Sequence, residues 1–265
     1  MVVQHNLRAM NSNRMLGLTQ TTQAKSTEKL SSGYKINRAA DDAAGLSISE
    51  KMRRQIRGLT QASSNAQDGI SMVQTAEGAL NEVHDMLQRM NELVIKGVNG
   101  TNQSVDQDYI QAEVDQLAEE ISRTANDTKF NKKDLLAANS TVDLQVGADA
   151  GQTIQITLKK MTAADIGVGS IDVSKSASIG KVESAIQSVS ELRSDLGAVQ
   201  NRLEHTINNL DNVVENTTAA ESQIRDTDMA KEMVKYSNNN ILAQAGQAML
   251  AQSNQSNQGV LSLLQ

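Results

Sequence analysis

The sequence predicts a mainly α protein, a long antiparallel helical bundle or coiled-coil rod that carries one small β-hairpin. Three observations predict it. The 265 residues include no proline. Apolar residues recur at spacings of three and four along one stretch in each half of the chain, which is typical of helix–helix seams. Alternating apolar and polar residues occur only in the middle. Two distant apolar stripes each need a partner, so we expect the two halves to pair with each other.

The first long helix is expected to run from about Leu46 to Lys96. Gly97, Asn99 and Gly100 then end it, as Gly and Asn do at helix C-termini. Its seam is a continuous series of apolar or small side chains: Met52, Ile56, Leu59, Ala62, Ala66, Ile70, Val73, Ala76, Leu80, Val83, Leu87, Met90 and Val94.

Two further helices are expected on either side of the middle region. The shorter runs from about Val105 to Ala125 and begins with polar residues suited to an N-terminus. The longer opens near Ile179 and matches the first helix in length. Its seam repeats the same spacing: Val182, Ile186, Val189, Leu192, Leu196, Val199, Leu203, Thr206, Leu210, Val213 and Thr217.

The middle of the chain changes its period to two. Hydrophobic residues alternate with polar ones over residues 142–146 and again over 154–158, which is typical of strands. The segment GADAGQ between them is turn material. We therefore expect a β-hairpin at about 141–159 and an irregular segment over 160–180, which is rich in Ser, Gly and Ala.

The outermost ends keep helical patterns that are diluted by Asn, Gln, Ser and Thr. The ranges are 2–32 and 228–265, with apolar positions at Val3, Leu7, Met10, Met229, Met233, Ile241, Ala245 and Met249. No other segment is left to cover these apolar faces. We expect both ends to be poorly ordered in a single copy and to form a second coiled-coil layer on assembly.

Composition narrows the classes of function. The chain has no cysteine, which excludes disulfides and thiolate metal sites. No apolar run reaches 18 residues, so no membrane insertion is expected. The N-terminal residues lack the basic and apolar regions of a secretory signal peptide. The net charge of −6 gives no support to nucleic acid as a partner.

Several patterns that could carry chemistry favour structural roles. His5, His84 and His205 are far apart in the sequence, so no metal site and no cofactor are expected. Asp41 and Asp42 are adjacent and point in different directions, so they are expected to cap or bend the chain rather than act as an acid–base pair.

A basic cluster precedes the first seam. It consists of Lys51, Arg53, Arg54 and Arg57. Without aromatic stacking residues it favours a salt-bridge face between copies over a nucleic-acid site. About forty residues separate the two helical halves, and they hold no nucleophile or metal constellation. An enzyme is therefore not expected.

Long motifs in both halves resemble bacterial flagellin. They are KLSSGYKINRAADDAAGLSIS, GLTQASSNAQDGISMVQTAEGALNEV, LQRMNEL, ELRSDLGAVQNRL, ILAQAGQAMLAQSNQ and GVLSLLQ. The resemblance covers about 1–140 and 180–265, without room for variable outer domains. It implies a structural subunit that polymerises into the flagellar filament for motility. The alternative is a hook–filament junction protein, which shares the terminal pattern and does not polymerise alone.

The resemblance also implies an architecture and a location. Residues 1–42 and 225–265 would form an inner terminal-helix layer (the D-zero domain), and 43–224 an outer helical layer (the D-one domain). SSGYKINRAADDAAG would join them as a spoke. The protein would be extracellular, exported by the flagellar type III system without a cleaved signal peptide. Its partners would be further copies, an export chaperone, and the filament cap and hook-associated proteins.

Two sets of site residues follow from the resemblance. The export chaperone and the filament core would use an apolar stripe on the C-terminal helix: Met229, Met233, Ile241, Leu242, Met249 and Leu250. Toll-like receptor 5 would bind the long N-terminal helix and its neighbour through Gln88, Arg89, Leu93 and Glu113. Helical geometry places Arg89 on the face nearly opposite the seam, and it places Leu93 toward that same face. An exposed Arg beside an exposed Leu is therefore expected.

Overall fold

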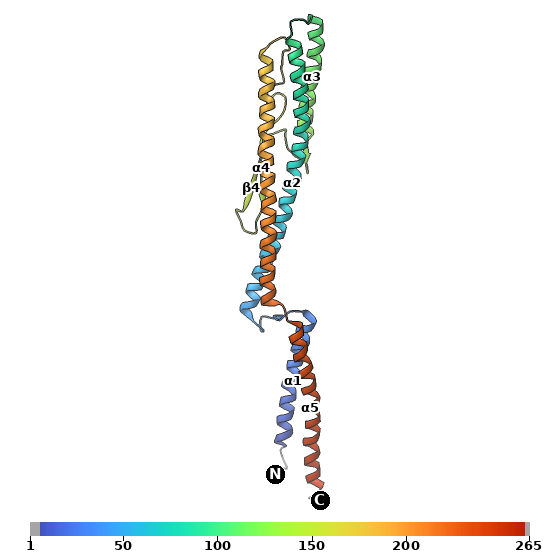
Figure 1. Ribbon diagram of the computed structural model, residues 1–265. Coiled ribbons are helices and arrows are strands. Elements are labelled where there is room, and N and C mark those ends of the chain that lie inside the picture. Colours follow the sequence, from blue (N-terminus) through green and yellow to red (C-terminus); the bar gives the residue numbers. More distant parts are fainter. Residues whose placement is uncertain (1–5, 263–265) are drawn as a thin grey trace. The chain divides into compact units, whose positions relative to one another are not determined.

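A computed structural model describes residues 6–262, and side-chain burial is described as far as Ser256. Val3, His5 and the end of the GVLSLLQ motif lie outside the described residues. The elements in chain order are α1 (Leu7–Ser32), α2 (Ala43–Val98), α3 (Ser104–Asp127), β1 (Lys129–Phe130), β2 (Lys133–Asp134), β3 (Ser140–Gln145), β4 (Thr153–Leu158), α4 (Ala177–Arg225) and α5 (Met229–Ser262) (Figure 1). The predicted fold class, mainly α with one small hairpin, is confirmed.

The chain divides into two compact units. One comprises Met1–Arg54 with Asn216–Gln265, and it contains α1 and α5. We call it the terminal unit. The other comprises Gln55–Glu215 and contains α3, the strands and most of α2 and α4. We call it the central unit.

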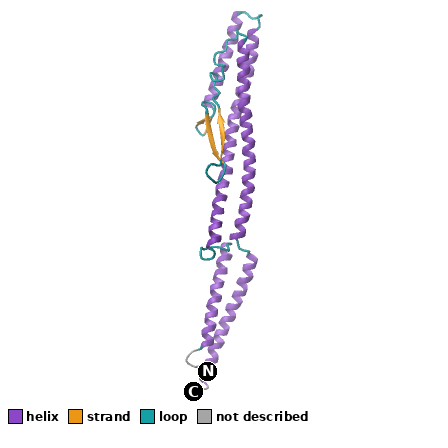
Figure 2. Cartoon of the chain, turned by 90° about the vertical axis from the view of Figure 1, so that its left-hand side faces the viewer, coloured by secondary structure: helices purple, strands orange, loops and turns teal. Residues whose placement is uncertain are grey.

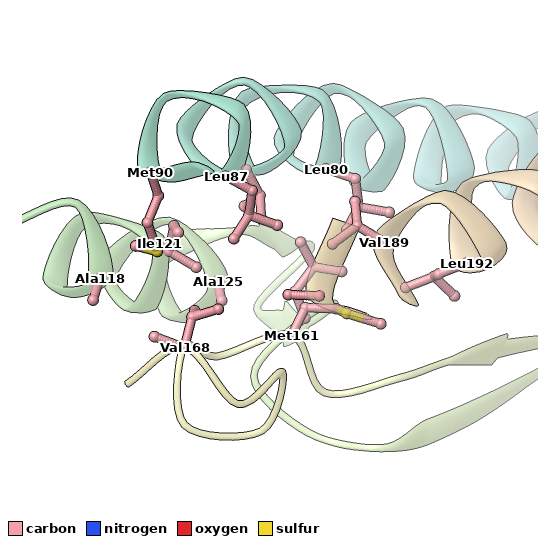
Figure 3. Packing of buried hydrophobic residues seen from close by; sticks show 14 of the residues in the cluster. Leu80, Leu87, Met90, Ala118, Ile121, Ala125, Met161, Val168, Val189 and Leu192 are labelled. Atoms are coloured by element: carbon pink, nitrogen blue, oxygen red, sulfur yellow. The ribbon is translucent and has the colours of Figure 1, made fainter. Parts of the chain in front are cut away.

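The core of the central unit lies between α2, α3 and α4 (Figure 3). Leu80 and Leu87 of α2 and Ile121 of α3 are fully buried, and Leu192 of α4 joins them. Phe130, the lone phenylalanine, packs at the edge of this cluster. Each fully buried Leu or Ile contributes roughly 1.5–3 kcal/mol. Aliphatic seams therefore stabilise the unit without an aromatic interior.

The β-hairpin packs with one face on the helices (Figure 2). β3 and β4 are antiparallel, with Val142 opposite Ile156. In β4 the apolar residues are buried and the residues between them are exposed, as a period of two requires. The hairpin expected at 141–159 is confirmed. Gly69 of α2 lies directly under Leu144, where any side chain would collide with the Leu144 methyl group.

The segment after the hairpin is irregular, as expected, yet it supplies much of the core. The buried residues in it are Met161, Ala163, Val168, Ile171 and Val173. The short β1–β2 hairpin was not predicted, because two-residue strands carry no detectable period. It is followed by Leu135 and Leu136, both fully buried.

In the terminal unit α1 and α5 lie side by side and antiparallel (Figures 1 and 2). The expectation that no segment remains to cover the terminal helices was wrong, because each covers part of the other. The cover is sparse. The buried residues are Ser26 in α1, and Glu232 and Ala243 among the described side chains of α5.

Candidate interaction surfaces

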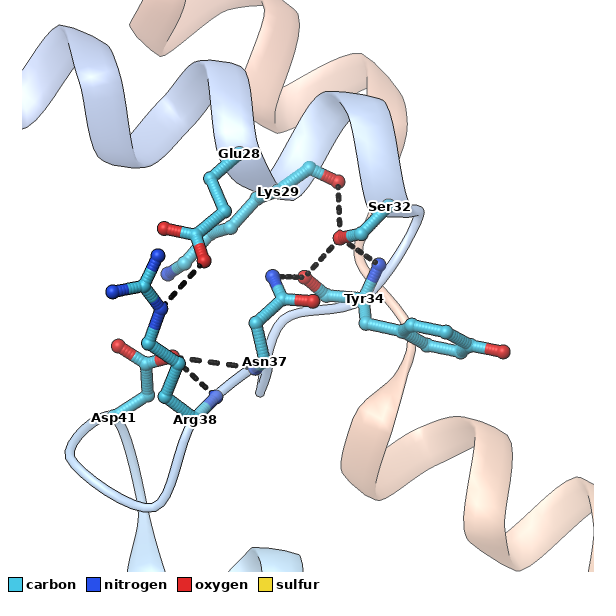
Figure 4. A network of polar contacts seen from close by, with 7 residues as sticks. All are labelled: Glu28, Lys29, Ser32, Tyr34, Asn37, Arg38 and Asp41. Carbon is cyan, nitrogen blue, oxygen red and sulfur yellow. Dashed lines mark hydrogen bonds and ion pairs between the residues drawn. The ribbon is translucent and has the colours of Figure 1, made fainter.

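The segment between α1 and α2 is held by its own polar side chains (Figure 4). The backbone N–H groups of Arg38 and Asn37 donate to Asp41 Oδ2 at 3.1 and 3.2 Å. Both bonds lower the pKa of Asp41, and the bond from Arg38 has the larger effect. Asp42 Oδ1 accepts from the Gly45 N–H at 2.9 Å and so caps α2. The interpretation of this pair as capping and bending residues is confirmed.

The ends of four helices meet around Arg225 within the terminal unit. Its guanidinium lies 4.7 Å from the centre of the Tyr34 ring and donates to Glu50 at 2.9 Å. Tyr34 forms a β-bridge with Asp226. The side chain of Arg225 is only 12% exposed, whereas that of Glu50 is 51% exposed, so the guanidinium is buried and the ion pair is partly open to solvent. These contacts join the end of α4 to α2 and to the residues that follow α1.

Large apolar side chains point outward from α1 and α5. On α1 they are Leu7, Met10, Met15 and Leu18, each more than half exposed. On α5 five of the six predicted stripe residues are exposed, Met229, Met233, Ile241, Leu242 and Met249, together with Val234, and Leu250 is half-buried. So many exposed large apolar side chains on one pair of helices are more than the single scattered ones of an ordinary surface, and they are typical of a protein–protein contact.

The second predicted set surrounds Arg89 on α2. Arg89 donates through Nε and Nη2 to Glu113 Oε1 on α3 at 3.1 and 2.9 Å, and through Nη1 to Glu92 at 3.1 Å. The hydrogen bond to Glu113 is the largest cause of a raised pKa at Arg89, and the bond to Glu92 adds to it. Arg89 is therefore charged. The structure brings Arg89 and Glu113 together at one exposed surface. Gln88 is also exposed, and its side chain contacts His84 at 2.9 Å.

Leu93 does not belong to that exposed surface. It is 3% exposed and packs in the core cluster between the helices, at the floor of the hollow beside Arg89. The expectation of an exposed Leu was wrong, because Leu93 is followed by Val94 on the same seam and α3 covers both. The sequence shows that α3 is amphipathic, but it does not show how far α3 extends over α2.

Tyr109 was missed by the sequence reasoning. It is 72% exposed on α3 and lines the same hollow as Arg89 and Glu113. An exposed tyrosine in a chain with only three tyrosines and one phenylalanine could have been noticed as a contact residue.

Within the described part of the chain, no group of three His, Asp or Glu residues is arranged to hold a metal ion. None of the described helices has the length and apolarity that a bilayer crossing requires.

Comparison with known proteins identifies the family. Residues 3–141 match the bacterial flagellin N-terminal helical region, and residues 179–264 match the bacterial flagellin C-terminal helical region. The chain belongs to the bacterial flagellin family. The unmatched stretch between the two regions contains most of the hairpin and the irregular segment. This flagellin thus has the short form expected from its sequence.

Two curated relatives are similar to this chain over its full length. A flagellin of Halalkalibacterium halodurans is 54% identical, with all of both chains aligned. A flagellar filament 31.3 kDa core protein of Treponema maltophilum is 49% identical, again over all of both chains. A crystal structure of Bacillus cereus flagellin is 29% identical, covers 56% of this chain and 88% of its own, and has a TM-score of 0.49. This flagellin is a structural subunit of the extracellular flagellar filament and not an enzyme.

Proposed function

We propose that this flagellin polymerises through its terminal helices, which form the inner layer of the filament. The inner layer is residues 1–42 and 225–265, and the outer layer is 43–224, with the segment around Asp41 as the spoke between them. The single observation that carries this proposal is the apolar surface of α1 and α5. Burying it between copies removes from water the side chains that one copy leaves exposed.

Met233→Asp is expected to abolish growth of filaments from the purified protein. Met233 is 57% exposed, so the folded copy tolerates the change, but an aspartate buried between copies would be an unpaired charge. Growth is measured by electron microscopy on filament seeds. Gln247→Asp on an exposed position of the same helix is the control and should reduce growth far less.

Two outcomes would contradict this proposal. Normal growth by Met233→Asp would show that the stripe is not an assembly surface. Failure of the unchanged chain to elongate seeds, while still binding to filament ends, would favour the alternative of a hook–filament junction protein.

The same stripe supports a proposal for the steps before assembly. An export chaperone would bind Met229, Met233, Ile241, Leu242, Met249 and Leu250 and keep them from premature contacts. The flagellar type III system would then export the chain. Growth would occur beneath the filament cap, on hook-associated proteins. What supports this order is that an apolar surface of this size favours association in any aqueous compartment.

We also propose that the soluble protein is a ligand of Toll-like receptor 5. Arg89, Gln88 and Glu113 would make the contact, with Leu93 supporting them from the floor of the hollow. The support is physical: an exposed guanidinium, already oriented by two carboxylates, loses little conformational entropy when a partner binds. This proposal concerns binding and is independent of filament growth.

Arg89→Ala is expected to weaken binding of the monomer to the receptor ectodomain by about 1–3 kcal/mol, the range for a central Arg anchor. The dissociation constant is measured by titration calorimetry or surface plasmon resonance. Arg123→Ala is a matched control, because Arg123 on α3 is also exposed and also paired with two carboxylates, Glu120 and Asp127. Equal dissociation constants for wild type and Arg89→Ala would reject the site.

A further inference from the structure

The contact between α1 and α5 has a polar centre. Ser26 Oγ of α1 donates to Glu232 Oε1 of α5 at 2.6 Å, and the two residues are 3% and 7% exposed. Lys235 Nζ lies 3.3 Å from the other carboxylate oxygen, and its own side chain is 67% exposed. The hydrogen bond from Ser26 is the first cause of a lowered pKa at Glu232, so the carboxylate is charged at neutral pH.

The helix α5 therefore turns a charged residue toward α1 and large apolar residues away from it. At 100° per residue, Glu232, Ala243 and Leu250 lie within about 20° of one another on the face toward α1. Val234 and Ile241 lie on the opposite face, at about 180–200° from Glu232. They are 60% and 62% exposed. The hydrophobic effect alone would favour rotating α5 by half a turn, which would bury them.

Hydrogen bonds at both ends of the α1–α5 pair fix how far one helix can slide along the other. At the far end, Asn6 Nδ2 donates to the Ser253 carbonyl at 3.2 Å. Near the junction, the Thr227 N–H donates to the Gly33 carbonyl at 2.9 Å. These bonds limit sliding along the axis, but Asn6 and Ser253 are small, partly exposed and neutral. Ser26 and Glu232 form the pair that includes a buried charge, and a rotation or slide that breaks it while Glu232 stays buried would leave that charge without its donor.

We propose that the Ser26–Glu232 hydrogen bond sets the rotation of α5 against α1, so that Val234 and Ile241 face outward toward a second copy. The role of the outward face rests on the proposed polymerisation through the terminal helices. A single buried polar pair is a known means of selecting one arrangement of packed helices over others that bury more apolar surface. Here the arrangement with α5 turned by half a turn would bury Val234 and Ile241 against α1. These side chains would then not be available for contact with a second copy.

Disulfide formation can report the rotation, because the chain has no cysteine of its own. A Cβ added at Gly246 would lie 3.9 Å from the Leu16 Cβ. Disulfides need a Cβ–Cβ separation of about 3.8 Å. Leu16→Cys with Gly246→Cys is therefore the native-rotation reporter. Leu16→Cys with Ala248→Cys is the opposite-face reporter, because Ala248 is exposed and lies about 200° around the helix from Gly246 and only about 3 Å along its axis.

Each reporter is placed in the full chain, alone and combined with Ser26→Ala, Glu232→Gln or Ser31→Ala. The chains are oxidised as monomers and as assembled filaments, and disulfides within one chain are quantified on non-reducing gels and by mass spectrometry. Ser26→Ala is expected to lower the yield of the native-rotation reporter relative to the opposite-face reporter about tenfold, since the buried Glu232 carboxylate loses its donor. Glu232→Gln keeps an acceptor for Ser26 and should retain most of the native yield.

The control Ser31→Ala makes the same change at an exposed position of α1 and should leave both yields unchanged. Equal reporter ratios in Ser26→Ala and the parent would overturn the proposal. So would a fall at the native-rotation reporter without a rise at the opposite-face reporter, because that result means separation of the helices rather than rotation. If the parent chain forms no filaments, the proposed polymerisation fails, and the ratio in monomers still decides the rotation.

Discussion

Leu87→Ala is expected to lower the free energy of unfolding of the central unit by about 2–5 kcal/mol. Leu87 is 0% exposed and packs in the cluster built from α2, α3 and α4. Removing three heavy carbon atoms loses their transfer free energy and leaves a cavity between helices. The effect is large because the core is a narrow seam in which few neighbours can move to fill the space.

The measurement is urea unfolding of the full chain, followed by circular dichroism at 222 nm. Ile95→Ala, on the same helix, is the control, because Ile95 is 53% exposed and its truncation should change stability by less than about 0.5 kcal/mol. Similar midpoints for the two variants would show that the seam around Leu87 is not the stabilising core.

Gly97→Ala is expected to destabilise the central unit although alanine is the better helix former. A Cβ at this position would lie 2.9 Å from the Cβ and 3.0 Å from the backbone oxygen of Val173, neither of which ends a flexible side chain. Overpacking of this kind costs about 1–3 kcal/mol. The helix propensity gained is about 0.5–1 kcal/mol. The balance is a net loss of up to about 2.5 kcal/mol.

Gly78→Ala is the matched comparison, because Gly78 lies on the same helix with nothing within 4 Å of an added Cβ. It should stabilise the protein by about 0.5–1 kcal/mol. Opposite signs of the two shifts in the thermal unfolding midpoint are the expected result. Stabilisation by both substitutions would mean that the segment around Val173 is not held against α2.

The sequence alone determined the elements whose signal is local and repeated. The seam from Met52 to Val94 predicted α2, because every third or fourth residue must meet the same neighbour. The alternation in 142–146 and 154–158 predicted the hairpin, because strands place successive side chains on opposite faces. Six ordered motifs were enough to predict the family, which the comparisons confirmed.

The tertiary structure decided what depends on segments far apart in the chain. It decided that Leu93 is buried, since α3 covers that part of α2. It decided that Met161, Val168 and Ile171 belong to the core, since an irregular segment has no period to reveal which side chains turn inward. It also decided that Ser26 meets Glu232, 206 positions away. A hydrogen bond between two such residues depends on how two helices pack, and no local pattern of either helix contains that information.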